Sequence, residues 1–329
     1  MPTVLITGGT GLIGTALSQH LLNEGYNVII LSRNPQETAS RHGVDAQRKF
    51  FRYSGNIFYS RWNIREMTID TAAFKEADFI VHLAGAGVAD KRWTDARKKE
   101  ILESRTRSSE LLLKYLKNEE NKVKAVVSAS AIGWYGPDNG KVFTEDDPPA
   151  NDFLGQTCVA WETSIDPVKA LGKRLVKLRT GIVLSNDGGA LAEFKKPIRL
   201  GVAAVLGDGK QMTSWVHIDD VCRGFIHAIE NHQMHGVYNL TAPHPVTHEK
   251  LTIDLATYMK GKMFIRSRVP AGILKLVLGE MSVEILKSAT VSSAKLQKEG
   301  FTFLFSDIDK ALQDLTGLRR AVISDGIHS

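Results

Sequence analysis

The stretch Thr3-Val4-Leu5-Ile6-Thr7-Gly8-Gly9-Thr10-Gly11-Leu12-Ile13-Gly14 decides the fold of this chain. An apolar run ends in spaced glycines and continues without a break into residues 15–22, which predicts a strand, a tight turn and a helix. The glycines let the backbone approach a pyrophosphate, whose charge is stabilised by free N–H groups at the helix N-terminus. In this context the stretch indicates dinucleotide binding rather than a purely structural turn. The residues assigned to the cofactor here are Thr7, Gly8, Gly9, Thr10, Gly11, Leu12, Ile13 and Gly14.

Composition limits the remaining possibilities. The chain has 329 residues, 43% hydrophobic and 24% charged, which suits a large α/β domain with a smaller lobe. The net charge is +6, but basic residues are dispersed among acidic ones, so we expect no nucleic-acid partner. Cys158 and Cys222 form no CxxC motif, which favours a reduced, cytoplasmic location and no structural zinc. The N-terminal apolar run is too short for a signal peptide, and no stretch is long enough to span a membrane.

A second buried strand, residues 26–32, ends in Ser32 and Arg33. These residues lie about 20 positions past the glycines, where an NAD-binding fold usually places an acidic residue on the ribose hydroxyls. A carboxylate would repel a 2′-phosphate, whereas a hydroxyl and a guanidinium bind one. The pair therefore favours NADP(H) over NAD(H). The alternative is that Arg33 is merely a solvated residue at a strand end.

Strands and helices continue to alternate along the chain. We expect strands at 57–62, 77–87 including its exit, 123–130, 174–184 and 236–240, and helices at 67–76 and 153–170. This pattern predicts an α/β fold, a Rossmann-type doubly wound parallel sheet with a smaller C-terminal substrate lobe. The predicted units are an NADP-binding domain at 1–185, with 214–240 returning to the sheet, a substrate lobe at 186–213 and 241–315, and a tail at 316–329.

Small residues at the carboxyl ends of strands let a cofactor lie against the backbone. A long helix that begins after the fourth strand would place further polar groups near the nicotinamide half, although its bland interpretation is a solvated basic face. The residues that these positions add to the cofactor site are Asn63, Leu83, Ala84, Gly85, Ala86, Ser104, Arg105 and Ala129. His82 lies within an apolar strand, and we expect a satisfied core histidine rather than a catalytic base.

Several motifs together resemble the extended short-chain dehydrogenases/reductases. They are residues 7–14, His82-Leu-Ala-Gly85, Ser128-Ala-Ser130 with Trp134-Tyr135-Gly136, and residues 214–220. The chain is most similar to the atypical, YfcH-like branch of NAD(P)-dependent epimerase-like proteins, through Arg92-Trp93-Thr94, Cys158-Val-Ala-Trp161-Glu162 and the block from Val269 to Phe301. The resemblance runs from residue 2 to about 315. It implies a doubly wound sheet, an NADP(H) site and a substrate lobe.

The ordinary catalytic pair of these reductases is missing. Their mechanism uses a Tyr-x-x-x-Lys on the helix after the fifth strand, where the lysine lowers the tyrosine pKa so that the phenol exchanges a proton. Aligning the helix on Glu162 places Leu154 at the tyrosine position and Cys158 at the lysine position. The one Tyr-x-x-x-Lys of the chain, residues 258–262, follows the last sheet strand, and we interpret it as a coincidence.

Two candidate catalytic residues remain. Ser130 could bind a carbonyl oxygen, and Tyr135 could supply a proton if it faces the crevice, although nothing near it in sequence would lower its pKa. We expect no metal site, because His232, His235, His244 and His248 straddle a loop and a strand without an accompanying set of carboxylates.

Two functions stay open. The first is an NADP(H)-binding oxidoreductase or epimerase-like protein acting on a small polar metabolite, which the retained substrate lobe favours. The second is a catalytically silent NADP(H)-binding redox sensor or scaffold, which the missing tyrosine and lysine favour. The partners that these interpretations allow are a small-molecule substrate and a second copy in a homodimer.

Overall fold

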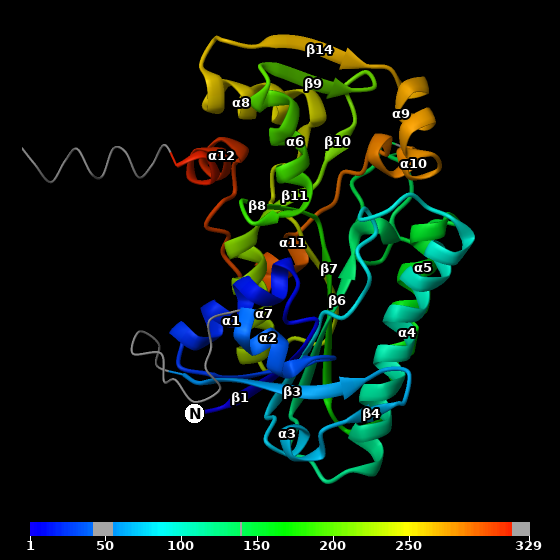
Figure 1. Ribbon diagram of the computed structural model, residues 1–329, viewed down its shortest axis with the longest axis vertical. Coiled ribbons are helices and arrows are strands. Elements are labelled where there is room, and N and C mark those ends of the chain that lie inside the picture. The colour runs from blue at the N-terminus through cyan, green and yellow to red at the C-terminus, as the bar shows by residue number, and fades with distance from the viewer. Residues whose placement is uncertain (42–54, 139, 318–329) are drawn as a thin grey trace, which may run out of the picture.

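A large, mostly parallel sheet organises the computed structural model, which describes residues 1–41, 55–138 and 140–317 (Figure 1). Its strand order is β12-β7-β6-β5-β1-β2-β3-β4, and only β4 runs antiparallel to its neighbour. The order reverses between β1 and β5, the point at which doubly wound sheets bind ligands beyond their carboxyl ends. The predicted fold class is confirmed. The strands are β1 Thr3–Thr7, β2 Asn27–Ser32, β3 Ile57–Asn63, β4 Thr68–Ile69, β5 Phe79–His82, β6 Ala125–Ala131, β7 Arg174–Thr180 and β12 Gly236–Leu240.

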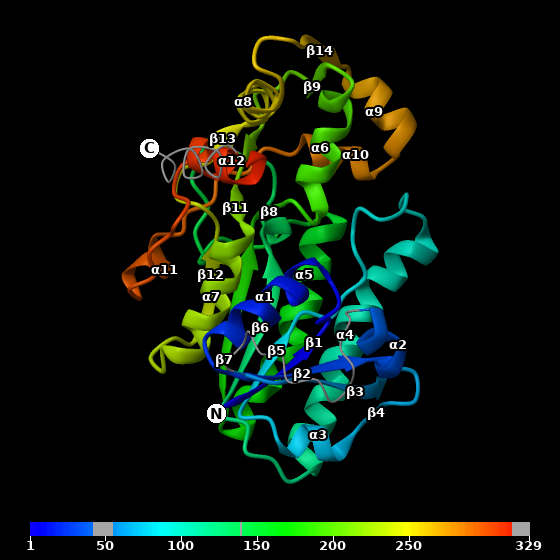
Figure 2. The same ribbon diagram turned by 60° about the vertical axis from the view of Figure 1, so that its left-hand side comes forward.

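Helices cover both faces of this sheet (Figures 1 and 2). On one face lie α1 (Leu12–Asn23) and α7 (Ile218–Glu230), and on the other lie α3 (Thr71–Lys75), α4 (Asp95–Asn118) and α5 (Phe153–Ile165). The side chains of β1 alternate between the two cores, with Val4 and Ile6 in the first and Leu5 in the second. Because both faces are buried, the strands appear in the sequence as continuous apolar runs.

The second lobe lies beyond the carboxyl ends of the strands, at the top of Figure 1. Three small two-stranded sheets and several helices enclose its own core, in which Leu191, Trp215, Leu251 and Leu312 are fully buried. Its elements are β8 Ile182–Ser185, α6 Gly189–Arg199, β9 Val202–Leu206, β10 Met212–Thr213, β11 Trp215–His217, β13 Val246–Thr247, α8 His248–Lys260, β14 Ile265–Val269, α9 Ala271–Leu278, α10 Met281–Leu286 and α12 Ile308–Thr316. The short helix α11, Ala294–Lys298, packs instead on β12 of the large sheet. A short helix α2, Pro35–Arg41, follows β2.

Three predicted elements were wrong in extent. The strand predicted at 174–184 is two strands, because the chain bends at Gly181 and β8 leaves the large sheet to pair with β11. A Cβ at Gly181 would lie 2.6 Å from the carbonyl oxygen of Ser214, so the bend requires glycine. The helix predicted at 67–76 is β4 followed by the short helix α3. Asp70 caps the N-terminus of α3, since its side chain accepts a hydrogen bond from the backbone N–H of Ala72.

The helix predicted at 153–170 ends as an α-helix at Ile165 and continues as a 3₁₀ segment, Asp166–Leu171. Pro167 is the cause, since proline lacks the N–H that an α-helix interior needs and is tolerated in a first turn. Residues 318–329 of the predicted tail lie outside the described residues, and Thr316 belongs to α12. Of the region 214–240, β12 joins the large sheet, whereas β11 does not.

Among the helices of residues 1–41, 55–138 and 140–317, none has the length and apolar character needed to cross a bilayer.

Candidate functional site

The glycine loop lies at the switch point, between β1 and the N-terminus of α1. Gly8 has a φ of +70° and packs so closely on the exit of β5 that a Cβ there would lie 2.8 Å from the carbonyl oxygen of Leu83. A Cβ at Gly14 would lie 2.4 Å from the carbonyl oxygen of Gly8. Gly11 caps α1 without a side-chain hydrogen bond, which leaves the first N–H groups of this helix to bind an anion.

Thr7 ties the end of β1 to the exit of β5. Its hydroxyl accepts hydrogen bonds from the backbone N–H groups of Leu83 and Ala84, both at 3.2 Å, and donates to Nδ1 of His82 at 2.7 Å. Nε2 of His82 then donates to Ser109 at 3.1 Å. His82 is therefore fully buried and satisfied in its neutral form, as expected, and it is no catalytic base. Burial and the nearby Arg105 lower its pKa to about 3.

This histidine should make the protein sensitive to acid. At pH values between about 3, the pKa of His82 in the folded protein, and 6.5, its ordinary pKa, this histidine is protonated in the unfolded chain and neutral in the folded one. Stability present above pH 6.5 is then lost as the pH falls, by about 1.4 kcal/mol per pH unit. In urea unfolding, the free energy of wild type should drop by about 1.4 kcal/mol more than that of His82→Asn between pH 7.5 and 5.5. The exposed-site variant His232→Asn should follow wild type, and equal slopes for His82→Asn would contradict the assignment.

Ser104 and Arg105 of α4 hold the other side of the β5 exit. The Ser104 hydroxyl accepts from the backbone N–H of Ala86 at 2.9 Å, and Nη1 of Arg105 donates to the carbonyl of Ala86 at 3.1 Å. The Arg105 guanidinium lies between Gly85 and the ring of Trp161, whose centroid is 4.8 Å from Cζ. The structure thus brings the predicted residues 83–86 together with Ser104, Arg105 and the glycine loop.

The end of β2 carries the predicted phosphate-binding pair. The Ser32 hydroxyl lies 2.8 Å from that of Thr38 and accepts from the backbone N–H of Asn34, so it is largely used within the turn. Arg33 is exposed, and no residue of the described chain forms a hydrogen bond or ion pair with its guanidinium. Arg61 of β3 is the register partner of Ser32 and adds a second positive charge at this edge.

Asn63, predicted to belong to the cofactor site, closes the turn between β3 and β4. Its Oδ1 accepts from the backbone N–H groups of Arg65 at 3.0 Å and Glu66 at 3.3 Å. The side-chain amide is the remaining group that a ligand could use. Ala129 lies in β6, buried in the core on the α1 and α7 side of the sheet.

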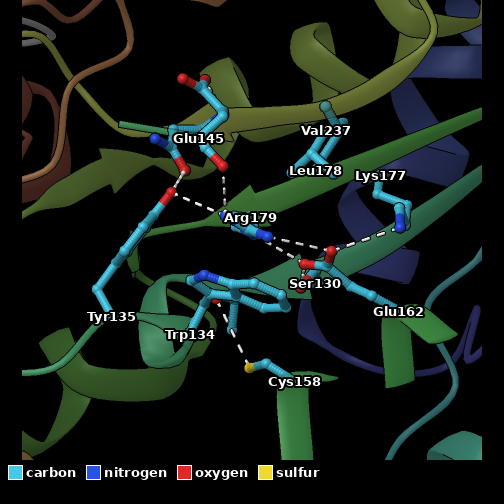
Figure 3. A network of polar contacts seen from close by, with 12 residues as sticks. Ser130, Trp134, Tyr135, Glu145, Cys158, Glu162, Lys177, Leu178, Arg179 and Val237 are labelled. Carbon is cyan, nitrogen blue, oxygen red and sulfur yellow. Dashed lines mark hydrogen bonds and ion pairs between the residues drawn. The ribbon is translucent and has the colours of Figure 1, made fainter. Parts of the chain in front are cut away.

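The two predicted catalytic residues belong to one buried polar network (Figure 3). The Ser130 hydroxyl donates to Oε1 of Glu162 at 2.7 Å. Arg179 donates from Nε to the same oxygen at 2.8 Å and from Nη2 to Oε2 at 3.2 Å. Lys177 lies 3.5 Å from Oε2 of Glu162 and donates to Asp166 at 2.9 Å. Ser130 is thus held by a carboxylate that also neutralises two buried cations.

Tyr135 forms the other end of this network. Its hydroxyl donates to Oδ1 of Asn239 at 2.7 Å and accepts from Nη1 of Arg179 at 3.1 Å. The ring is fully buried and stacks on Phe143 with 5.1 Å between centroids. Burial raises the pKa of the phenol to about 12, although Arg179 opposes the shift. A proton held this way is poorly placed for exchange at neutral pH, so the structure does not favour the predicted role of Tyr135 as a donor.

The network was missed at the level of sequence, where Glu162 served only to align the helix. A signal existed: Lys177 and Arg179 stand two positions apart in an otherwise apolar strand, so both point to one buried face and need a buried anion. Arg179 is also the register partner of Ser130. The spare pair Tyr258 and Lys262 lies at α8 and just beyond it, where the Tyr258 hydroxyl donates to Asp309, so its interpretation as a coincidence is supported.

A second titratable cluster, also missed, joins α1, α7 and α12. Nε2 of His217 lies 3.4 Å from Asp314, and its Nδ1 lies 3.7 Å from Oδ2 of Asp219. The other oxygen of Asp219, Oδ1, lies 3.3 Å from Nε2 of His20. The three side chains His217, Asp219 and Asp314 are close enough to hold a metal ion. However, Nδ1 of His217 accepts the backbone N–H of Asp219, which leaves the proton of the neutral ring on Nε2, facing Asp314. This arrangement favours a hydrogen-bonded cluster at the N-terminus of α7, which His217 caps, over a metal site.

Comparison with known proteins agrees with this architecture. The NAD dependent epimerase/dehydratase family matches residues 4–241, and a domain of unknown function, DUF1731, matches residues 269–315. Epimerase family protein SSP1921 of Staphylococcus saprophyticus is 34% identical over 319 residues, covering 96% of this chain and 99% of that protein. Epimerase family protein YfhF of Bacillus subtilis is 32% identical over 320 residues, covering 97% and 99%.

Among solved structures, that of human epimerase family protein SDR39U1 (isoform 2) with NADPH superimposes with a TM-score of 0.81 at 28% identity. The match covers 95% of this chain and 99% of the human one. The family match spans well over half of the chain, and the relatives are similar along nearly their whole length. The chain therefore belongs to the NAD dependent epimerase/dehydratase family, as an atypical extended short-chain dehydrogenase/reductase.

Proposed function

We propose that this protein binds NADP(H) and acts as an oxidoreductase or epimerase-like enzyme on a small polar metabolite. Two features together carry the cofactor proposal. The N-terminus of α1 at the sheet's switch point has no side-chain cap, and Arg33, at the end of the neighbouring strand β2, has no partner within the described residues. The loop from Thr7 to Gly14 would hold the diphosphate, and the backbone of residues 83–86 would lie along the nucleotide. When bound, NADPH supplies a hydride, and the residues of this chain bind and orient it.

Arg33 supports NADP(H) over NAD(H). An exposed guanidinium that has no partner among the described residues can bind a phosphate without breaking another contact, whereas a carboxylate at this position would repel one. The human relative solved with NADPH is consistent with this choice. A cytoplasmic location and a homodimer stay predictions.

Removing this guanidinium should abolish the preference. In calorimetric titrations, Arg33→Ala should weaken NADPH binding by about 10- to 100-fold and leave NADH binding within about twofold, because a charge-assisted hydrogen bond contributes roughly 1.5–3 kcal/mol. Arg65→Ala, which removes another exposed arginine at the β3–β4 turn, should change neither affinity. Equal affinities of wild type for NADPH and NADH, or no loss in Arg33→Ala, would contradict the proposal.

The proposal that the protein is an enzyme is supported by the intact substrate lobe and by family membership. The specific observation against it is that the hydroxyls of Ser130 and Tyr135 both donate within the buried network. That observation favours the second candidate, a catalytically silent NADP(H)-binding sensor or scaffold.

A stopped-flow screen separates the two candidates. Purified protein with NADPH should be mixed with sugars, quinones, aldehydes and imines while nicotinamide absorbance is followed. Oxidation above the no-substrate rate supports the enzyme. Tight NADPH binding together with silence across the panel would instead support the sensor.

A further inference from the structure

Arg105 occupies an unusual place at the altered catalytic centre. It projects from α4, which packs along α5, and its guanidinium fills the space between two groups that are far apart in sequence. A Cβ on Gly85 would lie 2.9 Å from Cζ, and the Trp161 ring centroid lies 4.8 Å from Cζ on α5. The guanidinium is therefore fixed against the exit of β5.

Cys158 stands at the position where the helix alignment would place the catalytic lysine, and Trp161 follows it by three residues, on nearly the same face of α5. Burial and the nearby Glu162 raise the pKa of the Cys158 thiol to about 12, and the positive charge of Arg105 opposes this shift. The thiol and the guanidinium are thus close enough to interact. The guanidinium of Arg105, from α4, thus lies near the place where a lysine at position 158 would have put its ammonium group.

The Arg105 guanidinium also has N–H groups that its hydrogen bonds to the described protein do not use. Both of its hydrogen bonds to protein, to the carbonyls of Ala86 and Ile101, use Nη1. Nε and Nη2 have no acceptor within the described part of the chain. Neither is one of the fully buried nitrogens without a partner in that part, so both retain some solvent exposure. Three N–H groups of a fixed planar cation remain for a ligand.

From this geometry we propose that Arg105 supplies a positive charge where the missing lysine would have carried one, and that it binds the cofactor by donating from Nε and Nη2 to the hydroxyls of the nicotinamide-side ribose. The inference rests on the proposed binding of NADP(H). A guanidinium stays charged at every physiological pH, so Arg105 orients the nicotinamide but passes no proton. It is a binding residue that supplies the charge of the lysine without its partnership with a tyrosine.

Two ligands test this assignment, NADPH and 2′,5′-ADP, which carries the adenosine half alone. Arg105→Met keeps length and stacking but removes the donors, and it should weaken NADPH binding by about 10-fold or more while 2′,5′-ADP binding stays within about twofold. It should also reduce the enhancement of dihydronicotinamide fluorescence at saturating NADPH. Arg107→Met, at an exposed position two residues on, should match wild type in all three measurements.

Arg105→Lys carries the test if Arg105→Met does not fold. It retains a cation but loses the planar fork, so its NADPH affinity should fall less, again with 2′,5′-ADP unaffected. Parallel losses for both ligands would show that Arg105 merely supports the β5 exit, and unchanged NADPH affinity would also overturn the proposal. Failure of wild type to bind either ligand would instead refute the proposed function itself.

Discussion

Replacing Glu162 by glutamine should destabilise the folded protein by about 3–5 kcal/mol, because it leaves the buried Arg179 and Lys177 with one anion, Asp166, in place of two. Glutamine matches the shape of glutamate and can still accept from Ser130, so the loss measures charge rather than packing. A domain stability of about 5–15 kcal/mol makes such a change large. Urea unfolding followed by circular dichroism at pH 7 gives the difference.

Glu193→Gln is the matched control. Glu193 pairs with Lys196 on the surface, with 66% of its side chain exposed, so its neutralisation should change stability by less than about 0.5 kcal/mol. A loss below about 1 kcal/mol in Glu162→Gln would show that water or side-chain rearrangement compensates the cations. The charge of Glu162 would then not contribute to the stability of the fold as its contacts indicate.

Gly14→Ala should abolish high-affinity NADPH binding, with a loss above about 100-fold. The added Cβ would lie 2.4 Å from the carbonyl oxygen of Gly8 and 2.5 Å from Cα of Gly9, and both are backbone atoms that cannot step aside. The loop must move, and the N–H groups that are proposed to bind the diphosphate move with it. Calorimetric titration measures the affinity, and thermal unfolding reports the accompanying loss of stability.

Gly272→Ala provides the comparison. This glycine lies in α9, its Cβ would meet nothing within 4 Å, and its φ is not positive. Alanine is favoured over glycine in a helix by up to about 1 kcal/mol, so this variant should be equally or more stable and bind NADPH normally. Normal NADPH affinity in Gly14→Ala would remove the glycine loop from the proposed site.

The sequence predicted the cofactor half of the fold far better than the catalytic half, for a physical reason. Glycine spacing and continuous apolar runs act locally, so residues 3–14 already imply β1, the loop and α1. The network around Glu162 joins β6, α5 and β7 and depends on strand register, which pairs Ser130 with Arg179. Register is a property of the assembled sheet, so a local pattern could indicate buried cations but could not identify their anion.

The same limit explains the fate of Ser130 and Tyr135. Its position at a strand's carboxyl end suggested that Ser130 faces a substrate, and the role of Tyr135 depended on its facing the crevice, but the direction of a side chain depends on what packs over it. Glu162 of α5 and Asn239 of β12 come from distant segments and accept the hydrogen bonds of the two hydroxyls. The bend at Gly181 is similar, since only the contact with Ser214 reveals why the chain turns there.

The proximity of Arg105 to Cys158 also limits which residues position 158 can accept. A lysine introduced at position 158 would bury an ammonium beside an existing guanidinium, and two like charges in so little water destabilise each other. Cys158→Lys should therefore destabilise the fold while Arg105 is present, and should cost less when combined with Arg105→Met. The effects of substitutions at these two positions are thus expected not to add.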